Sequence, residues 1–229
     1  MNKSILITGC SSGLGLALTN FYLNNKYKVY GISRSRPDIK NKNFYFKDFN
    51  LSKIDKIKEE LSSFIYDIKN LNTVYLNAGM LGEIKEMTNL GIDEIKEVLD
   101  LNVFANKEIL DILTKTKVKN IIALSSGASQ KGSKGWGAYS LSKSSLNMLI
   151  NLYAKEMTNV KLLAVAPGVI ETPMTDYIRY EVNDNIFTSA KILKDGDIQK
   201  PDIAAKRVHS VIEKIEKFES GSFIDVRNI

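Results

Sequence analysis

The chain has 229 residues, 44% of them hydrophobic, and its 32 lysines and arginines against 26 aspartates and glutamates give a formal net charge of +6. This size and apolar content predict a single domain over residues 1–229 with a real core, and they exclude a disordered chain. One cysteine and one histidine exclude an intrachain disulfide and any Cys- or His-based metal cluster, so no metal is expected.

Short β-branched segments alternate with longer amphipathic segments along the whole chain. The expected strands are residues 4–8, 28–33, 43–47, 73–77, 120–125, 160–166 and 222–226, and the expected helices are residues 13–24, 55–68, 92–114, 139–157 and 201–218. This alternation predicts an α/β fold, a Rossmann-like, doubly wound parallel sheet of about seven strands with helices on both faces. Because ligands bind such sheets at the carboxyl ends of the strands, functional residues should follow the strands directly.

The segment TGCSSGLG follows the first expected strand and places Gly9, Gly13 and Gly15 in a turn before a helix. Gly9 can turn the chain sharply, Gly13 lets the backbone approach a pyrophosphate, and Gly15 lets the helix pack close to the sheet. The helix N-terminus supplies free N–H groups and a positive dipole end, and Ser11 and Ser12 add hydroxyls. The pattern predicts a phosphate-binding loop, and a turn that binds nothing is the alternative.

The second expected strand ends in Ser33 and Arg34, at the point where nicotinamide cofactors are distinguished. An acidic residue there would bind the ribose 2′-hydroxyl, whereas a guanidinium matches a 2′-phosphate in charge and geometry. The sequence therefore favours NADP(H), and ordinary loop charges are the alternative. Asp48 and Phe49 follow the third expected strand, where they are expected to hold the adenine.

The segment YSLSK contains Tyr139 and Lys143, which lie one turn apart on the same face of an expected helix. Carbonyl reduction needs a proton at the substrate oxygen, and an ammonium group beside a tyrosine lowers the pKa of its phenol from about 10. Ser126 can hydrogen-bond the substrate oxygen, and Asn102 could fix a water that links the lysine to solvent. The alternatives are a helix surface pair for Tyr139 and Lys143, a turn for Ser126, and a helix cap or kink for Asn102.

Several features follow one another from Ile5 to about Pro173: TGCSSGLG, LNAG at 76–79, Asn102, Ser126, YSLSK and APGVIET. Together and in this order they resemble the classical short-chain dehydrogenase/reductase family. The resemblance implies that Tyr139 is the general acid/base, that Lys143 lowers its pKa and binds ribose, and that Ser126 positions the carbonyl. It also implies that Asn102 completes a proton relay. Further cofactor-binding residues implied by the resemblance are Leu14, Asn77, Ala78, Gly79, Pro167, Gly168, Val169 and Thr172.

A finer resemblance links NAGMLGEIKE, SKGWGAYSLSK and ESGSFIDV to sepiapterin reductases and bacterial benzil (dicarbonyl) reductases. It implies that Asp225 anchors a pterin, and a polar residue near the end of a terminal strand is the alternative. Residues 174–200 fall where the family carries its substrate loop. Four residues within and near this lid are expected to line a substrate pocket, or only to pack the lid: Trp136, Met174, Tyr177 and Ile178.

These patterns predict an NADP(H)-dependent oxidoreductase that reduces a small ketone, α-diketone or pterin side chain, with Tyr139 as general acid. The alternatives are an alcohol dehydrogenase or 3-oxoacyl-type reductase of the same family, and a non-catalytic NADP(H)-sensing regulatory protein. The resemblance implies a homodimer or homotetramer formed through helices 92–114 and 139–157. Without a bilayer-length apolar stretch, a signal-peptide layout or a basic run interleaved with aromatics, we expect a cytoplasmic protein with no membrane or nucleic-acid partner.

Overall fold

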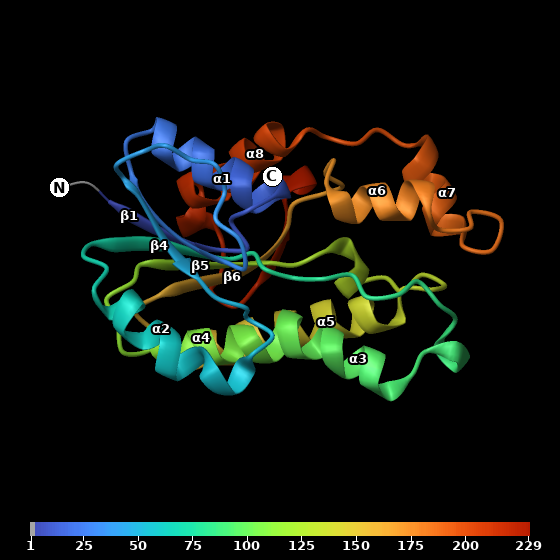
Figure 1. Ribbon diagram of the computed structural model, residues 1–229, viewed down its shortest axis with the longest axis horizontal. Coiled ribbons are helices and arrows are strands. Elements are labelled where there is room, and N and C mark those ends of the chain that lie inside the picture. Colours follow the sequence, from blue (N-terminus) through green and yellow to red (C-terminus); the bar gives the residue numbers. More distant parts are fainter. Residues whose placement is uncertain (1–2) are drawn as a thin grey trace.

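The computed structural model describes residues 3–229, and these residues build one parallel sheet between two layers of helices (Figure 1). The strands are β1 (Ser4–Thr8), β2 (Lys28–Ser33), β3 (Phe44–Asp48), β4 (Leu71–Leu76), β5 (Asn120–Leu124), β6 (Lys161–Ala166) and β7 (Phe223–Asp225). Their order across the sheet is β3-β2-β1-β4-β5-β6-β7, and each neighbouring pair is parallel. The chain leaves β1 toward β3 and then returns to β4 on the other side, which creates a switch point between β1 and β4.

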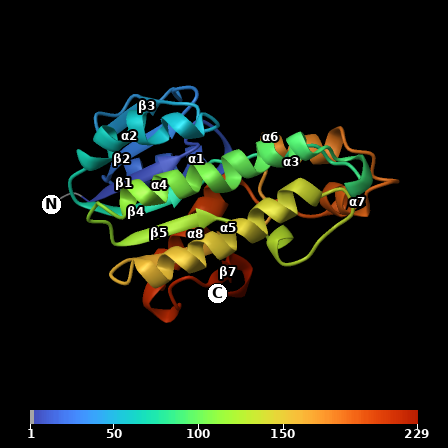
Figure 2. The same cartoon turned by 90° about the horizontal axis from the view of Figure 1, so that it is seen from below.

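Helices cover both faces of this sheet. One face carries α1 (Gly13–Asn24) and α8 (Pro201–Glu213), and the other carries α2 (Ile57–Tyr66), α4 (Ala105–Leu113) and α5 (Gly137–Glu156), which lie in front of the strands in Figure 2. The short helix α3 (Ile92–Leu99) packs beside α5. Within residues 3–229, none of the helices is both long and apolar enough to cross a membrane.

The central strand β1 is buried throughout because both of its faces are covered. Successive side chains point to opposite faces, so Ile5 and Ile7 join the apolar cluster under α1 and α8, whereas Leu6 joins the cluster on the side of α2, α4 and α5. The doubly wound architecture expected from the strand–helix alternation is therefore confirmed.

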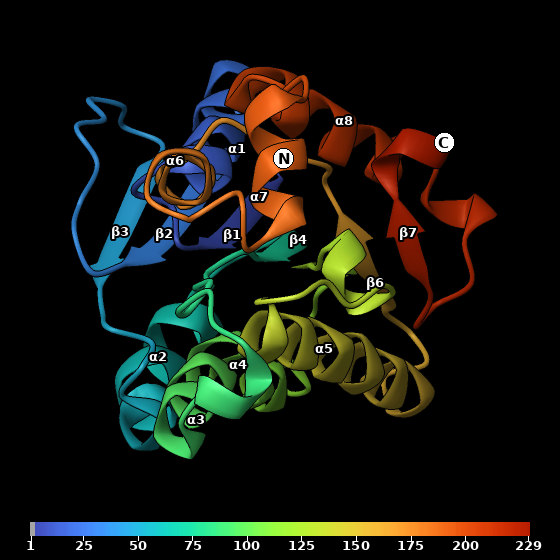
Figure 3. The same cartoon turned by 90° about the vertical axis from the view of Figure 1, so that its right-hand side faces the viewer.

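Two expected elements differ from the structure. The expected helix 92–114 is interrupted by a π-helical turn at Asp100–Phe104, which separates α3 from α4. Residues 174–200, expected as a loop, contain two helices, α6 (Pro173–Tyr180) and α7 (Thr188–Asp195), which extend beyond the carboxyl ends of the strands (Figures 1 and 3). Pro173 at the first position of α6 and the Thr172 side chain as its N-cap explain where α6 begins.

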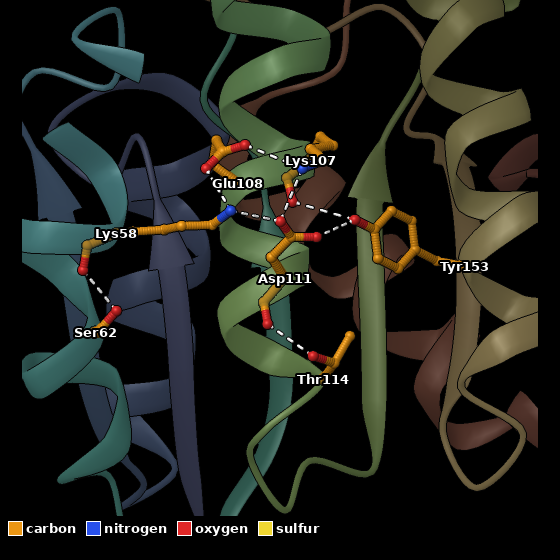
Figure 4. Close-up of polar contacts among 7 residues, drawn as sticks. All are labelled: Lys58, Ser62, Lys107, Glu108, Asp111, Thr114 and Tyr153. Atoms are coloured by element: carbon orange, nitrogen blue, oxygen red, sulfur yellow. Dashed lines mark hydrogen bonds and ion pairs between the residues drawn. The ribbon is translucent and has the colours of Figure 1, made fainter. Parts of the chain in front are cut away.

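A polar network links α2, α4 and α5, the helices that cover one face of the sheet (Figure 4). The carboxylate of Asp111 accepts from Lys58 at 2.7 Å, from Lys107 at 2.8 Å and from the hydroxyl of Tyr153 at 2.5 Å. Burial alone would raise the pKa of Asp111, but the hydrogen bonds from these three side chains hold it well below its usual range. The network ties the three helices together at one carboxylate.

Candidate active site

A cavity lies at the carboxyl ends of the strands and spans the switch point between β1 and β4. Its volume is about 430 Å³, within the range of small-molecule sites. The sequence-predicted residues that line it are Gly9, Ser11, Ser12, Gly13, Leu14, Gly15, Ser33, Arg34, Phe49, Asn77, Ala78, Gly79, Ser126, Trp136, Tyr139, Lys143, Pro167, Gly168, Val169, Thr172 and Met174. Four others, Asp48, Asn102, Tyr177 and Asp225, are not among its lining residues.

The glycine loop between β1 and α1 has no room for side chains at two of its positions. Gly9 has a φ of +66°, and a Cβ there would lie 2.9 Å from the Cα of Ala78. A Cβ on Gly15 would lie 2.0 Å from the carbonyl oxygen of Gly9. Gly13, Leu14 and Gly15, the first residues of α1, line the cavity, and the Ser12 side chain forms no capping hydrogen bond within the described residues. The first N–H groups of a helix have no partner within that helix and suit an anion, so phosphate binding by this loop stays a prediction.

Thr8 and Asn77 hold this loop in place, and the sequence patterns did not predict the role of Thr8. Thr8 is the last residue of β1, and its buried hydroxyl accepts hydrogen bonds from the backbone N–H of Asn77 at 2.9 Å and of Ala78 at 3.0 Å. The side-chain amide of Asn77 donates to the carbonyls of Thr8 and Gly9, both at 3.0 Å. The β1 and β4 loops are thus joined by four hydrogen bonds across the switch point.

Two arginines follow β2, and only one of them lines the cavity. Arg34 is exposed there and forms no ion pair within residues 3–229. Arg36 instead lies over the rings of Phe44 and Phe46, with its guanidinium carbon 5.8 Å from each ring centroid. Ser33 is held by the buried thiol of Cys10, with 3.1 Å between Sγ and Oγ. A ligand bound at the carboxyl end of β2 would therefore contact the side chains of Arg34 and Ser33.

The region expected to hold an adenine follows β3, and the structure places the two predicted residues differently. Phe49 lines the cavity, whereas Asp48 is exposed on β3 outside it. Asn50, Leu51 and Ser52 also line the cavity and were missed, because a turn fixed by the Ser52 N–H bond to Asn50 Oδ1 carries no recognisable pattern.

The side chains of Ser126, Tyr139 and Lys143 meet in the cavity. Ser126 follows β5, accepts from the N–H of Ala128 at 3.1 Å and hydrogen-bonds to the phenol of Tyr139. Lys143 lies one turn after Tyr139 on α5, donates to the carbonyl of Leu124 at 2.7 Å and lies 5.6 Å from the Tyr139 ring centroid. This arrangement can hold a carbonyl oxygen between the hydroxyls of Ser126 and Tyr139.

Burial dominates the protonation of Tyr139 and Lys143. It raises the pKa of Tyr139 to about 12, against a lowering effect of the Ser126 hydrogen bond. It also lowers the pKa of Lys143 to about 8. The Lys143 ammonium bonds to the carbonyl of Leu124 and lies over the Tyr139 ring, and the lowering of the Tyr139 pKa by Lys143 stays a prediction. The phenol stays protonated at neutral pH, as a general acid must be.

Asn102 lies in the π-helical turn and is completely buried. Its side-chain amide bonds to both backbone groups of Met80, at 2.8 Å each, and donates to Ser142 at 2.9 Å. A Cβ on Gly79 would lie 3.0 Å from Asn102 Oδ1 and 3.5 Å from Lys143 Nζ. Asn102 therefore fixes the backbone beside Lys143 through its side chain, and its predicted bond to a water stays a prediction.

The lid is formed by α6 and α7, which cover one side of the cavity. Met174, Ile178 and Trp136 line that side, and so does Leu193, which the sequence patterns did not distinguish from core residues. Tyr177 packs into the small apolar cluster of the lid instead. The apolar wall is therefore built from the lid and from the start of α5.

Asp225 is engaged by a neighbour rather than open to the cavity. Its carboxylate accepts from Arg227 Nη2 at 2.6 Å and from Nε at 2.9 Å, and this hydrogen-bonded ion pair lowers the pKa of Asp225. A Cβ on Gly168, which lines the cavity, would lie 3.8 Å from the side chain of Arg227. The ion pair therefore lies beside the cavity, and the carboxylate faces its own cation.

Comparisons with known proteins agree with this geometry. A family model described as short chain dehydrogenase matches residues 3–183. Benzil reductase ((S)-benzoin forming) of Bacillus subtilis is 28% identical over 238 residues, covering 97% of each chain, and bovine sepiapterin reductase is 31% identical over 109 residues, covering 47% of this chain and 40% of its own. The crystal structure of a short chain dehydrogenase family protein from Francisella tularensis has a TM-score of 0.85 at 25% identity, covering 98% of this chain and 97% of its own.

The family match covers the glycine loop, the Ser126–Tyr139–Lys143 group and the wall after β6, which are the parts that build the cavity. The resemblance inferred from the motifs is thereby confirmed. The chain belongs to the short-chain dehydrogenase family, and it is an oxidoreductase with a site for a nicotinamide cofactor.

Proposed function

We propose that this protein reduces a small carbonyl compound with NADPH, with Tyr139 as the general acid. The observation that carries the proposal is one cavity that reaches from Arg34 after β2 to Ser126 after β5 and passes the glycine loop on the way. This arrangement suits a long anionic cofactor at one part of the cavity and a carbonyl group at another.

The residues of the cavity fit a phosphorylated nicotinamide cofactor. The crowded positions of Gly9 and Gly15 and the free N–H groups of α1 suit a pyrophosphate. The unpaired Arg34 beside Ser33 suits a 2′-phosphate, and among the described residues that line the cavity none is acidic. Lys143 would hold the nicotinamide ribose. When bound, the cofactor supplies the hydride.

The protein's own part in the reaction is to hold the carbonyl and to deliver a proton. Ser126 and Tyr139 would both donate to the carbonyl oxygen, and the Tyr139 proton would pass to that oxygen as negative charge develops on it. The protonated Lys143 stabilises the phenolate that forms, because it lies against the same ring. The reaction therefore does not require the substrate to carry a charged group.

The substrate side of the cavity supports an uncharged, apolar carbonyl compound. Trp136, Met174, Ile178 and Leu193 line it, and the Asp225 carboxylate is taken by Arg227. An α-diketone fits this wall better than a pterin that needs a free carboxylate, and the name of the Bacillus relative supports the same class. An alcohol dehydrogenase would use the same residues in reverse. A cofactor-sensing protein would not require Ser126, Tyr139 and Lys143 together.

The test is NADPH oxidation at neutral pH with benzil, 2,3-butanedione, sepiapterin and simple aldehydes, each compared with NADH. We expect the α-diketones to be the best substrates and NADPH the better donor. The Tyr139→Phe variant should lose turnover by about 10²-fold or more while it still binds NADPH. Undiminished turnover in this variant, or no turnover of any carbonyl by the parent protein, would contradict the proposal.

We also propose that two copies of the chain associate through α5. We place the protein in the reducing cytoplasm, because a chain with one cysteine has no intrachain disulfide to maintain. Leu141, Met148 and Leu152 are exposed, and their spacing places them on one stripe of α5. Phe104, also exposed, ends the π-helical turn that packs against α5. The Met148→Glu variant should be a monomer by light scattering under conditions in which the parent is a dimer or tetramer. A monomeric parent would refute the association.

A further inference from the structure

Trp136 is the single tryptophan of the sequence, and it connects the lid to the catalytic helix. It is the N-cap residue of α5, three positions before Tyr139, and the centroids of the two rings lie 6.0 Å apart at an interplanar angle of 65°. Its indole Nε1 donates to the hydroxyl of Ser189 on α7 at 2.6 Å. We call this hydrogen bond the Trp136–Ser189 latch.

The lid packs against the same end of α5 on a second side. The ring of Phe187, which precedes α7, lies against Gly135, where a Cβ would be 2.6 Å from that ring and 2.8 Å from Ile84. Gly135 has a φ of +91°, so both its conformation and its surroundings exclude a side chain. The α7 end of the lid thus packs on Gly135 through Phe187 and hydrogen-bonds to Trp136 through Ser189.

The latch also shapes the cavity. Trp136 lines it from α5, and Leu193 lines it from α7, one turn after Ser189. A rotation of the indole would change the wall next to Tyr139, and a displacement of α7 would move Leu193. Ser189, whose hydroxyl accepts from the indole, is therefore placed to fix this part of the cavity wall.

We infer that Ser189 is a positioning residue that fixes the indole of Trp136 beside Tyr139, so that Trp136 selects substrates with a flat, apolar group next to the carbonyl. The inference rests on the proposed carbonyl reduction for its selectivity. The latch itself is observable without turnover, because emission from the single tryptophan reports the surroundings of its own ring.

The experiment compares Ser189→Ala with Ser189→Thr, which keeps the hydroxyl, and with Thr188→Ala, an exposed control on the same helix. In Ser189→Ala we expect stronger quenching of tryptophan emission by acrylamide and an approximately tenfold higher KM for benzil. We expect kcat and the KM for 2,3-butanedione to change by less than about threefold, because its two methyl groups are too small to make much contact with the Trp136 indole. Ser189→Thr and Thr188→Ala should behave like the parent.

A double variant separates the latch from a general loss of packing. Trp136→Phe removes the N–H donor, so Ser189→Ala added to it should raise the KM for benzil no further. Additive effects, or parent-like quenching and KM in Ser189→Ala, would overturn the inference. A parent protein that reduces no carbonyl, with the quenching change intact, would refute the proposed function and leave the latch supported.

Discussion

A methyl group added at residue 15 should distort the loop that suits the cofactor. The Cβ of a Gly15→Ala variant would lie 2.0 Å from the carbonyl oxygen of Gly9 and 2.5 Å from Asn77 Nδ2. A carbon normally approaches a carbonyl oxygen to about 3.3 Å, so the Gly9 carbonyl must retreat by more than about 1 Å. That movement would break its 3.0 Å hydrogen bond from the Asn77 amide.

The size of the effect follows from these two changes. Overpacking costs about 1–3 kcal/mol, and a lost hydrogen bond costs about 0.5–1.5 kcal/mol. We therefore expect the free energy of unfolding to fall by about 2–4 kcal/mol, which for a chain of this size lowers Tm by roughly 4–16 °C. The affinity for NADPH should fall as well, because the moved carbonyl belongs to the pyrophosphate loop.

Calorimetry and an NADPH titration measure both effects, with Gly132→Ala as the matched control. A Cβ at residue 132 meets nothing within 4 Å, so this variant should unfold within about 1 kcal/mol of the parent. If Gly15→Ala melted like Gly132→Ala and bound NADPH as tightly as the parent, the crowding at Gly15 would not confine the loop.

Three further predictions test charge. Arg34→Ala should raise the KM for NADPH about 10- to 100-fold and leave the KM for NADH nearly unchanged. The control variant Arg36→Ala, at the arginine that stacks on Phe44 and Phe46, should change neither KM. Equal effects of Arg34→Ala on both cofactors would exclude Arg34 as the 2′-phosphate ligand. The kcat/KM of carbonyl reduction should fall above about pH 8, because Lys143 then loses its proton while Tyr139, with a pKa of about 12, keeps its own; a pH–rate profile flat to pH 10 would contradict this. Asp111→Asn should lower stability by about 1 kcal/mol at pH 7. Because the folded pKa of Asp111 lies below its unfolded value, this stabilisation is present above about pH 4 and is lost as the pH falls through the folded pKa, so the Tm difference from the parent should shrink in acid.

The sheet and the catalytic group could be predicted because their signals are local. Each strand is a short β-branched run, and Tyr139 and Lys143 are one helical turn apart, so the spacing already places them on one face. The glycines of the first loop are similar, because their positions between a strand and a helix limit what they can do.

Other features depend on contacts that no local pattern contains. The π-helical turn interrupts a continuous apolar pattern, and what holds Asn102 there is the backbone of Met80, 22 residues away. The helices α6 and α7 are short and polar, so their stability comes from packing on Trp136 and its neighbours rather than from propensity. The ion pair of Asp225 with Arg227 requires the turn after β7, which a terminal strand pattern does not predict.

The π-helical turn also determines where this chain tolerates a change in length. Each residue of an α-helix turns the chain by about 100°, so the extra residue at Asp100–Phe104 rotates α4 relative to α3. Val98 before the turn packs with Leu90 and Ala138, whereas Ile109 after it reaches the core under the sheet. Removing one residue from this turn would restore a regular helix and swing Ile109 toward solvent, while a deletion near Gly132 would only shorten a surface loop. A deletion scan should therefore find that a single-residue deletion in this helical segment is far more damaging than one near Gly132.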